Sequence, residues 1–165
     1  MTRAFAHDRF TYPLPEGHGF PLGRYRMLRE AIEQQGIAGV VEAPGATDDD
    51  LLLAHDPRYL ERVVTGRLSD REVKAVGLPW SPELVERGRR SVGATIAAAR
   101  TALDDGVGIN LGGGTHHAFA GSGKGFCTFN DVVVATRRLR TDGAIARVLV
   151  VDLDVHQGDG THSML

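Results

Sequence analysis

Apolar positions along the chain recur with two different spacings. Short apolar runs bounded by glycine, proline or charged residues indicate strands, whereas apolar side chains three or four positions apart indicate helices with one buried face. The short runs predict strands at residues 4–6, 38–43, 106–111 and 147–151. The longer spacing predicts helices at residues 21–35, 57–64, 82–105 and 131–140, with another starting after Thr47. This alternation favours an α/β fold with a mainly parallel sheet and helices on both faces.

Residues typical of helix ends support these helices. Thr47, Asp56 and Ser81 are good N-caps, and proline follows the last two, which fits a first helical turn. The three aspartates at residues 48–50 complement the positive end of a helix dipole, so we interpret them as a solvated helix start and not as a metal cluster. The apolar stripes expected to face the core are Tyr25, Leu28 and Ile32, then Val85, Val92, Ile96, Ala99 and Leu103, and finally Val132, Ala135 and Leu139.

Length and composition predict one globular domain and exclude several classes of protein. With 165 residues, 42% apolar and 24% charged, the chain can bury one sizeable core, and we expect a single domain over residues 1–165. The net charge of −2 offers no basic surplus for nucleic acid, and no apolar run predicts a membrane span or a secretory leader. The single cysteine, Cys127, cannot form an internal disulfide and is expected to be a small buried side chain. We therefore expect a cytoplasmic protein.

Two carboxylates and an imidazole follow the last apolar run. Asp152, Asp154 and His156 occupy alternating positions directly after Val151. Side chains two residues apart on a strand share a face, so the three groups would converge where a buried strand ends. An acidic, glycine-containing turn is the simpler alternative. The carboxyl end of a buried strand is where open α/β sheets bind ligands, which favours a metal site.

A pair of histidines follows the strand predicted at residues 106–111. His116 and His117 come directly after three glycines, at the sheet edge where the metal site is expected. A neutral imidazole can accept a proton from water, and a carboxylate on its other nitrogen fixes the tautomer. Once Asp154 and His156 are taken as metal ligands, Asp152 and Asp159 are the acids left to accept these hydrogen bonds from the histidines. An adjacent histidine pair alone is more typical of a surface turn, but these acids favour catalysis. The glycines match neither a phosphate loop nor a dinucleotide fingerprint.

Three sequence motifs carry a resemblance to a known family. They are GGGTHHA at residues 112–118, GFCTFND at residues 125–131 and VDLDVHQGDGT at residues 151–161. In this order and spacing they resemble the zinc-dependent histone deacetylase superfamily, which includes acetoin-utilisation proteins and acetylpolyamine amidohydrolases. Gln157 and Gly158 resemble the class IV branch and bacterial relatives. The resemblance implies a three-layer αβα fold of the arginase/deacetylase type and hydrolysis that removes acetyl or other acyl groups from lysine-like or polyamine amines.

The resemblance also implies roles for individual residues. Asp154 and His156 match two of the family's three zinc ligands, and Fe²⁺ is an alternative metal. His116 and His117 match the paired active-site histidines, with Asp152 and Asp159 as their respective carboxylate partners. His117 is the preferred general base, although the sequence does not separate the two roles. The backbone around Asp152, Asp154 and His156 matches a structural K⁺ site.

The substrate side of the implied site is less fully matched. Gly125 and Phe126 match the wall of a narrow tunnel that admits an acyl-lysine arm, and an aromatic side chain suits a passing alkyl chain. Phe126 and Phe129 could instead be ordinary core residues. The loop at residues 76–81 has no acidic residue, whereas many deacetylases carry one there to hold the substrate backbone. The resemblance therefore does not extend to a residue that holds a peptide substrate by its backbone.

The length of the chain limits what the resemblance implies. The family's third zinc ligand, an aspartate, and its transition-state tyrosine are expected beyond the equivalent of Leu165, so we interpret the chain as a partial deacetylase domain. Two protein ligands predict weak zinc binding and little or no turnover. One alternative is a non-catalytic interaction or oligomerisation module, because uncovered apolar faces favour self-association. Another is an arginase-like hydrolase, which needs two metal ions and more carboxylates than this sequence offers.

Overall fold

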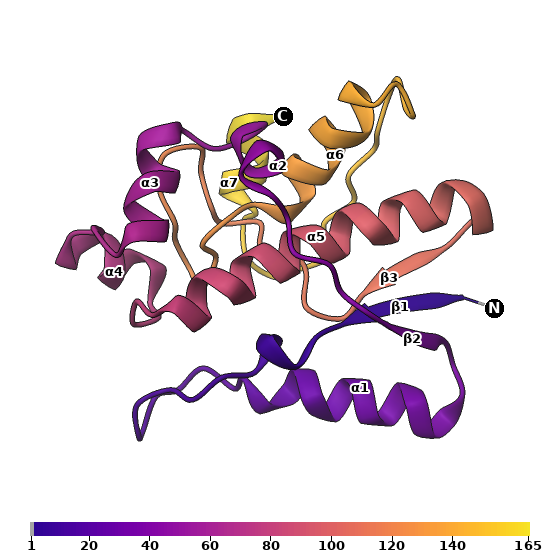
Figure 1. Cartoon of the computed structure of the whole chain (residues 1–165), viewed down its shortest axis with the longest axis horizontal. Coiled ribbons are helices and arrows are strands. Elements are labelled where there is room, and N and C mark those ends of the chain that lie inside the picture. Colours follow the sequence, from indigo (N-terminus) through magenta and orange to yellow (C-terminus); the bar gives the residue numbers. More distant parts are fainter. Residues whose placement is uncertain (1) are drawn as a thin grey trace.

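A three-stranded parallel sheet lies between two helices in the structure, a computed structural model that describes residues 2–165 (Figure 1). The strands are β1 (Arg3–Ala6), β2 (Gly39–Glu42) and β3 (Gly108–Asn110), in the order β2-β1-β3. Arg3 of β1 pairs with Gly39 of β2 and with Gly108 of β3. Three of the four predicted strands are confirmed, and their carboxyl ends share one edge of the sheet because they run parallel.

Helices cover both faces of this sheet, which confirms the expected three-layer αβα arrangement. The two covering helices are α1 (Gly23–Gln35) and α5 (Pro82–Asp105), which lie on opposite faces (Figure 1). Ala4 and Ala6 of β1 pack with Ile32 of α1, whereas Phe5 packs with Ala98 of α5. The division follows from the strand period of two, which points successive side chains to opposite faces.

The largest core lies on the far side of α5 from the sheet. The remaining helical elements are η1 (Asp8–Phe10), α2 (Asp48–Leu52), α3 (Pro57–Thr65), α4 (Asp70–Val76), α6 (Asp131–Thr141) and α7 (Asp159–Met164). Val63 of α3, Val92 of α5 and Val133 of α6 meet in this core with no exposed surface. Burial of each such side chain stabilises the fold by roughly 1.5–3 kcal/mol. No helix within residues 2–165 has both the length and the apolar content needed to cross a membrane.

The predicted helix starts are confirmed by their caps. The Thr47 side chain accepts from the Asp50 amide, and the Asp50 carboxylate accepts from the Thr47 amide, so the acidic run is a helix start. Asp56 and Ser81 also accept hydrogen bonds from amides in the first turns of their helices. Helix α4 was not predicted, although Ser69 and Glu72 form the same reciprocal cap.

The strand predicted at residues 147–151 is wrong. Within the described chain β3 pairs only with β1, and no β-ladder joins this segment to the sheet. Val148, Leu149 and Val151 are 49%, 85% and 69% exposed. The prediction used the apolar run alone, but a buried strand also needs a neighbour that takes its backbone hydrogen bonds. The segment instead passes beside α6 (Figure 1).

Two predicted core positions are also wrong. Leu28 of α1 is 45% exposed and Leu103 of α5 is 51% exposed. In α1 only Ile32 is fully buried, because that helix packs on the two short strands β1 and β2. Leu103 lies in the last turn of α5, beyond Ala98, which packs against the sheet. The helical period was therefore read correctly, but the buried face is shorter than the helix.

Candidate active site

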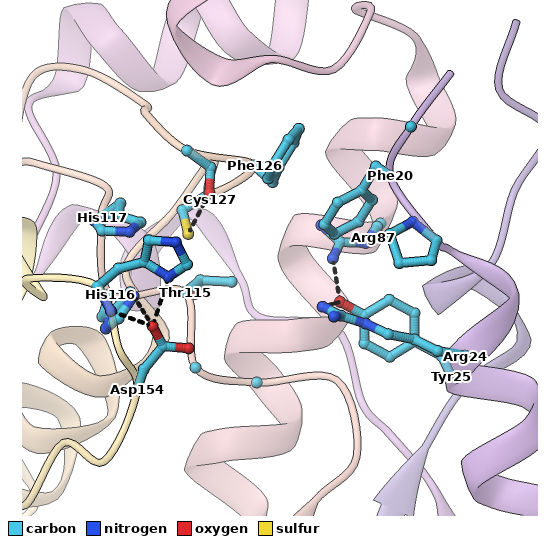
Figure 2. A pocket seen from close by; sticks show the side chains of 16 residues that line it. Phe20, Arg24, Tyr25, Arg87, Thr115, His116, His117, Phe126, Cys127 and Asp154 are labelled. Carbon is cyan, nitrogen blue, oxygen red and sulfur yellow. Dashed lines mark hydrogen bonds and ion pairs between the residues drawn. The ribbon is translucent and has the colours of Figure 1, made fainter. Parts of the chain in front are cut away.

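A cavity of about 400 Å³ lies beyond the carboxyl end of β3. Two groups of side chains line it from opposite sides (Figure 2). The first group is His116, His117 and Asp154, and the second is Phe20, Arg24, Tyr25 and Arg87. His156, whose ring lies 5.8 Å from that of His117, also lines the cavity. Phe126 and Cys127 also line the cavity. Its volume falls within the range of small-ligand sites, roughly 300–1,000 Å³.

A buried carboxylate fixes the glycine loop that carries the two histidines. Asp131, the first residue of α6, is 1% exposed and accepts hydrogen bonds from the amides of Gly114 at 3.0 Å and Thr115 at 2.8 Å. It also accepts from the hydroxyls of Thr115 at 2.7 Å and Thr95 at 2.6 Å. Four hydrogen bonds to one carboxylate leave the loop little freedom. The loop therefore reaches the cavity already ordered.

His116 and Asp152 form the first histidine–carboxylate pair. His116 is 7% exposed, and its Nδ1 lies 2.6 Å from Asp152 Oδ2. An ionised carboxylate only accepts, so Nδ1–H donates this bond, and in the neutral form of the ring the lone pair is on Nε2. Hydrogen bonds from the His116 ring and the Asp154 amide lower the pKa of Asp152. A Cβ on Gly158, whose φ is +59°, would lie 2.6 Å from Asp152 Oδ2 and exclude this arrangement.

His117 and Asp159 form the second pair, which a cation extends. His117 Nδ1 lies 2.7 Å from Asp159 Oδ1, and Lys124 Nζ donates to the other oxygen of the same carboxylate. Lys124 and His117 lower the pKa of Asp159 to about 2. The centroids of the His116 and His117 rings are 4.2 Å apart. At Gly125 a Cβ would lie 2.7 Å from His117 Cδ2, so glycine is needed beside that ring.

Turns, not a strand, bring the segment after Val151 to the cavity. The Asp154 amide donates to Asp152 Oδ1 at 3.0 Å, and the His156 amide donates to Asp154 Oδ1 at 2.8 Å. These bonds lower the pKa of both carboxyls. Asp154 Oδ1 lies 3.9 Å from His116 Nε2, and the His156 ring lies 5.8 Å from the His117 ring. The structure thus brings together all four groups that the sequence places at one site.

Asp154 and His156 offer the two donors that could hold a metal ion. Asp154 Oδ1 and His156 Nδ1 are 2.7 Å apart, and their side chains are 51% and 69% exposed. One oxygen and one imidazole nitrogen suit Zn²⁺ or Fe²⁺ in type. Across residues 2–165, no three or more histidine, cysteine or acidic side chains are arranged to hold a metal. The donor set fits a metal in kind but supplies only two ligands.

Phe126 forms an aromatic wall with Phe20 from a distant part of the chain. Their rings stack at 4.4 Å. Phe126 has a φ of +66°, which is a strained conformation for an aromatic residue. A hydrogen bond from its amide to Val76 O, at 2.7 Å, helps to hold the backbone in this conformation. Phe126 is 39% exposed and is not a core residue, whereas Phe129 is 1% exposed and lies in the main core.

Cys127 lines the cavity, but its environment makes its thiol unreactive. It is 6% exposed, and burial raises the pKa of its thiol to about 11. A reactive cysteine requires a thiolate, which this environment disfavours. The expectation that Cys127 is a small buried side chain is confirmed.

Several cavity residues were not predicted from the sequence. Phe20, Arg24 and Tyr25 precede or begin α1, and Arg87 lies within α5. Asp131 was read only as the first residue of a helix. Arg87 lies at helical spacing from Leu84 and Ala94, which are buried, and this spacing was the available signal for it. No local signal identified the others, because their roles depend on contacts between distant segments.

Comparison with known proteins identifies the family. Residues 18–165 match the histone deacetylase domain. The chain is 42% identical over 158 residues to an uncharacterized protein of Picosynechococcus sp., covering 94% of this chain and 53% of that protein. It is 35% identical over 160 residues to a probable deacetylase of Methanothermobacter thermautotrophicus, covering 90% of this chain and 46% of that protein. It is 38% identical over 156 residues to histone deacetylase 2 of Arabidopsis thaliana, covering 87% of this chain and 39% of that protein.

The match covers most of this chain but only part of each relative. The chain spans 53%, 46% and 39% of the lengths of these three proteins. The matched region includes all three motifs, and with them the two histidine–carboxylate pairs, Asp154 and His156. The chain therefore belongs to the histone deacetylase family.

Proposed function

We propose that this chain contributes the histidine and metal-binding half of a zinc-dependent amidohydrolase, which removes acetyl or other acyl groups from lysine-like or polyamine amines. One observation carries the proposal. Two imidazoles, each hydrogen-bonded through Nδ1 to its own carboxylate, line the same cavity as Asp154 and His156. Family membership favours this activity over that of an arginase-like hydrolase.

The two histidines have distinct proposed roles. With Nδ1–H donating to a carboxylate, Nε2 of each ring is the atom that can accept a proton from water. We assign the general base to His117, whose side chain is more exposed than that of His116, 15% against 9%. His116 then supplies positive charge or a proton to the departing amine. Asp152 and Asp159 orient the rings and hold one tautomer.

Asp154 and His156 are the proposed metal ligands, with Zn²⁺ as the first choice and Fe²⁺ as the alternative. When bound, zinc supplies Lewis acidity that polarises the acyl carbonyl. With two exposed donors among residues 2–165, we expect weak metal binding and slow turnover. We also propose the backbone around Asp152, Asp154 and His156 as a K⁺ site. Cations there would offset the repulsion between these carboxylates.

The aromatic wall suggests how a substrate arm is held. Gly125 leaves room beside His117, and Phe126 stacks on Phe20 at 4.4 Å, so an alkyl chain can lie against two aromatic faces. The loop at residues 76–81 packs Val76 and Leu78 into a core at 1% exposure and presents no acid. An isolated acylated amine therefore suits this surface better than a substrate held along its peptide backbone.

Zinc-dependent hydrolysis tests the proposal. The substrates are a fluorogenic acetyl-lysine peptide and an acetylated polyamine, with Zn²⁺ uptake as a second readout where turnover falls below detection. We expect slow, zinc-dependent hydrolysis that falls by roughly 10²-fold or more in His117→Ala, and zinc uptake that is lost in Asp154→Ala. His162→Ala, which changes an exposed histidine, should alter neither. Equal activity and equal zinc uptake in the wild type and in all three variants would contradict the proposal.

A non-catalytic role in self-association is the second candidate function. Leu149, Val151, Leu153 and Val155 are between 69% and 93% exposed, which is unusual for four apolar side chains at alternating positions. An unpaired segment of this kind can join a second copy of the chain. Sedimentation of the wild type and of Leu153→Lys distinguishes the candidates. A dimer that Leu153→Lys dissociates supports this role, and a monomer at all concentrations excludes it.

A further inference from the structure

Lys124 is a charged side chain beside the candidate active site that the proposed hydrolysis does not use. Its Nζ donates to Asp159 Oδ2, while His117 Nδ1 lies 2.7 Å from the other oxygen of the same carboxylate. The Lys124 side chain is 51% exposed, whereas those of Asp159 and His117 are 24% and 15% exposed. The three groups therefore form a line of contacts from solvent to the cavity, which His117 lines.

The surroundings of Lys124 hold its side chain in this position. A turn at residues 124–127 fixes its backbone, because the Lys124 amide donates to Cys127 O at 3.0 Å and the Cys127 amide donates to Lys124 O at 2.9 Å. The ammonium also lies 5.9 Å from the centroid of the Phe119 ring, which is within the range of a cation–π contact. Phe119 follows His117 by two residues, so the lysine contacts the same stretch of chain that carries the imidazole.

The same turn contacts the opposite edge of the His117 ring. A Cβ on Gly125 would lie 2.7 Å from His117 Cδ2, so the backbone of the turn packs closely there. Nδ1 and Cδ2 flank the bond about which the ring rotates, and half a rotation would exchange their places. The hydrogen bond from Nδ1 to Asp159 distinguishes the two orientations, because a C–H group in that place cannot make it. A displaced carboxylate would therefore also misplace Nε2.

Asp152, the partner of His116, is held in another way. Its second oxygen, Oδ1, accepts from the Asp154 amide at 3.0 Å, and substitution of a side chain leaves this backbone donor in place. The second oxygen of Asp159 instead accepts from the side chain of Lys124. One substitution can therefore release the second pair while the first stays intact, and His116 serves as an internal reference.

We propose that Lys124 is a positioning residue, which holds the Asp159 carboxylate against His117 so that this ring keeps one orientation and one tautomer. An ionised carboxylate only accepts, so the bond requires the proton on Nδ1 and leaves the lone pair of the neutral ring on Nε2. Without the ammonium, this partly exposed carboxylate is free to turn, and water competes for its bond to the imidazole. The use of Nε2 as a general base rests on the proposed function, whereas the tautomer does not depend on catalysis.

NMR of the imidazole nitrogens in the metal-free chain tests the proposal without requiring turnover. Measurement at about pH 9 keeps imidazoles neutral and lysine charged, so each ring reports its tautomers. We expect His117 in the wild type to carry its proton on Nδ1. In Lys124→Met the population of its Nε2–H tautomer should rise roughly threefold, as the loss of an exposed ion pair predicts, while His116 stays unchanged. An unaltered His117 in this variant would overturn the proposal.

Two further variants separate positioning from a general loss of order. Lys124→Arg, which restores a cation, should return His117 to its wild-type tautomer. Lys74→Met removes the only other lysine of the sequence, an exposed side chain of α4, and should change neither histidine. A shift in Lys124→Met that Lys124→Arg does not reverse, or one of equal size at both histidines, would also overturn the proposal.

Hydrolysis of the acetyl-lysine peptide in the presence of Zn²⁺ gives a second readout. Lys124 is not among the described residues that line the cavity, so Lys124→Met should lower kcat by roughly threefold and leave KM unchanged. A change confined to KM would overturn the proposal, because it would place the lysine at the substrate and not behind Asp159. If the tautomer shifts in Lys124→Met but no protein hydrolyses the peptide, the positioning role stands and the proposed hydrolase alone is contradicted.

Discussion

The loop at residues 112–118 and the segment at residues 147–157 both supply side chains to the candidate active site, yet they are held very differently. The loop is tied to the buried carboxylate of Asp131, and His116 is 7% exposed. The segment has no β-ladder within the described chain, and Leu153 and Val155 are more than 90% exposed. Its place is set mainly by turns and by the bond from His116 to Asp152.

The difference separates two requirements of such a site. The histidines must be fixed in orientation, and the interior of this chain provides that through buried hydrogen bonds. The proposed metal donors, Asp154 and His156, must be available to a cation, and their side chains are 51% and 69% exposed. The loop that carries the histidines is therefore ordered by the fold itself, whereas the segment that carries Asp154 and His156 depends on a few local contacts.

Replacement of Asp131 should have the largest effect on this comparison. Asp131→Ala leaves four donors without their acceptor, two of them on buried Thr115, and we expect the free energy of unfolding to fall by roughly 4 kcal/mol. Urea denaturation measures this loss. Asp104→Ala changes an exposed aspartate of α5 and should cost less than about 0.5 kcal/mol. Similar losses in both variants would mean that Asp131 does not organise the loop.

Acid should weaken the packed region through His55. This side chain is 3% exposed, bonds to Phe119 O, and accepts from the Asn130 amide. Burial lowers its pKa from 6.5 to about 4. The unfolded chain therefore binds a proton first, so stability is complete above pH 6.5 and declines as the pH falls towards 4. The expected loss is about 3 kcal/mol.

Two measurements check the His55 prediction. Urea denaturation across this pH range gives the loss of stability, and NMR titration gives the pKa of the imidazole directly. The carboxylates of Asp152, Asp154 and Asp159 have lowered pKa values, so they contribute to the loss only at lower pH. A His55 pKa near 6.5 would show that the histidine is accessible and would remove this distinction between the two regions.

A methyl group at Gly125 should disturb the contact between the aromatic wall and the histidines. The φ of +56° and a Cβ position 2.7 Å from His117 Cδ2 both oppose Gly125→Ala. We expect a loss of about 2 kcal/mol and a displaced His117 ring. Gly121→Ala, where nothing lies within 4 Å of the added Cβ, is the matched control. An unchanged His117 NMR signal in Gly125→Ala would contradict the close packing.

The smallest effect is expected in the exposed segment. Leu153 is 91% exposed, so Leu153→Lys should change the free energy of unfolding by less than about 0.5 kcal/mol. Val134 has no exposed surface, and Val134→Ala should cost roughly 2 kcal/mol. Thermal and urea denaturation of both variants measure the contrast. A loss above about 1 kcal/mol in Leu153→Lys would show that the segment is packed in solution.

Local sequence signals predicted much of the fold. The caps at Thr47, Asp56 and Ser81 fixed three helix starts, because capping is decided within one turn. The strand at residues 147–151 was wrong because pairing depends on a neighbour elsewhere in the chain, which an apolar run does not specify. The same limit explains Leu103, whose burial depends on how far the sheet extends beneath α5.

The candidate site was predictable on one side only. Its histidines and acids stand in short motifs, and the structure brings them together. Their chemical roles remain predictions. Arg87 and Tyr25 are 62 positions apart and meet only because α1 and α5 approach the same cavity. Composition and spacing carry no information about such a contact.

Titration of the chain with Zn²⁺, followed by NMR of the histidine ring nitrogens, tests the central claim most directly. The claim is that Asp154 and His156 hold one divalent cation beside His116 and His117. We expect the His156 ring to respond at one equivalent of zinc, with smaller shifts at His116 and His117, and no response at His162. Asp154→Ala should abolish these shifts. A response that begins at His162, or one that survives in Asp154→Ala, would contradict the account.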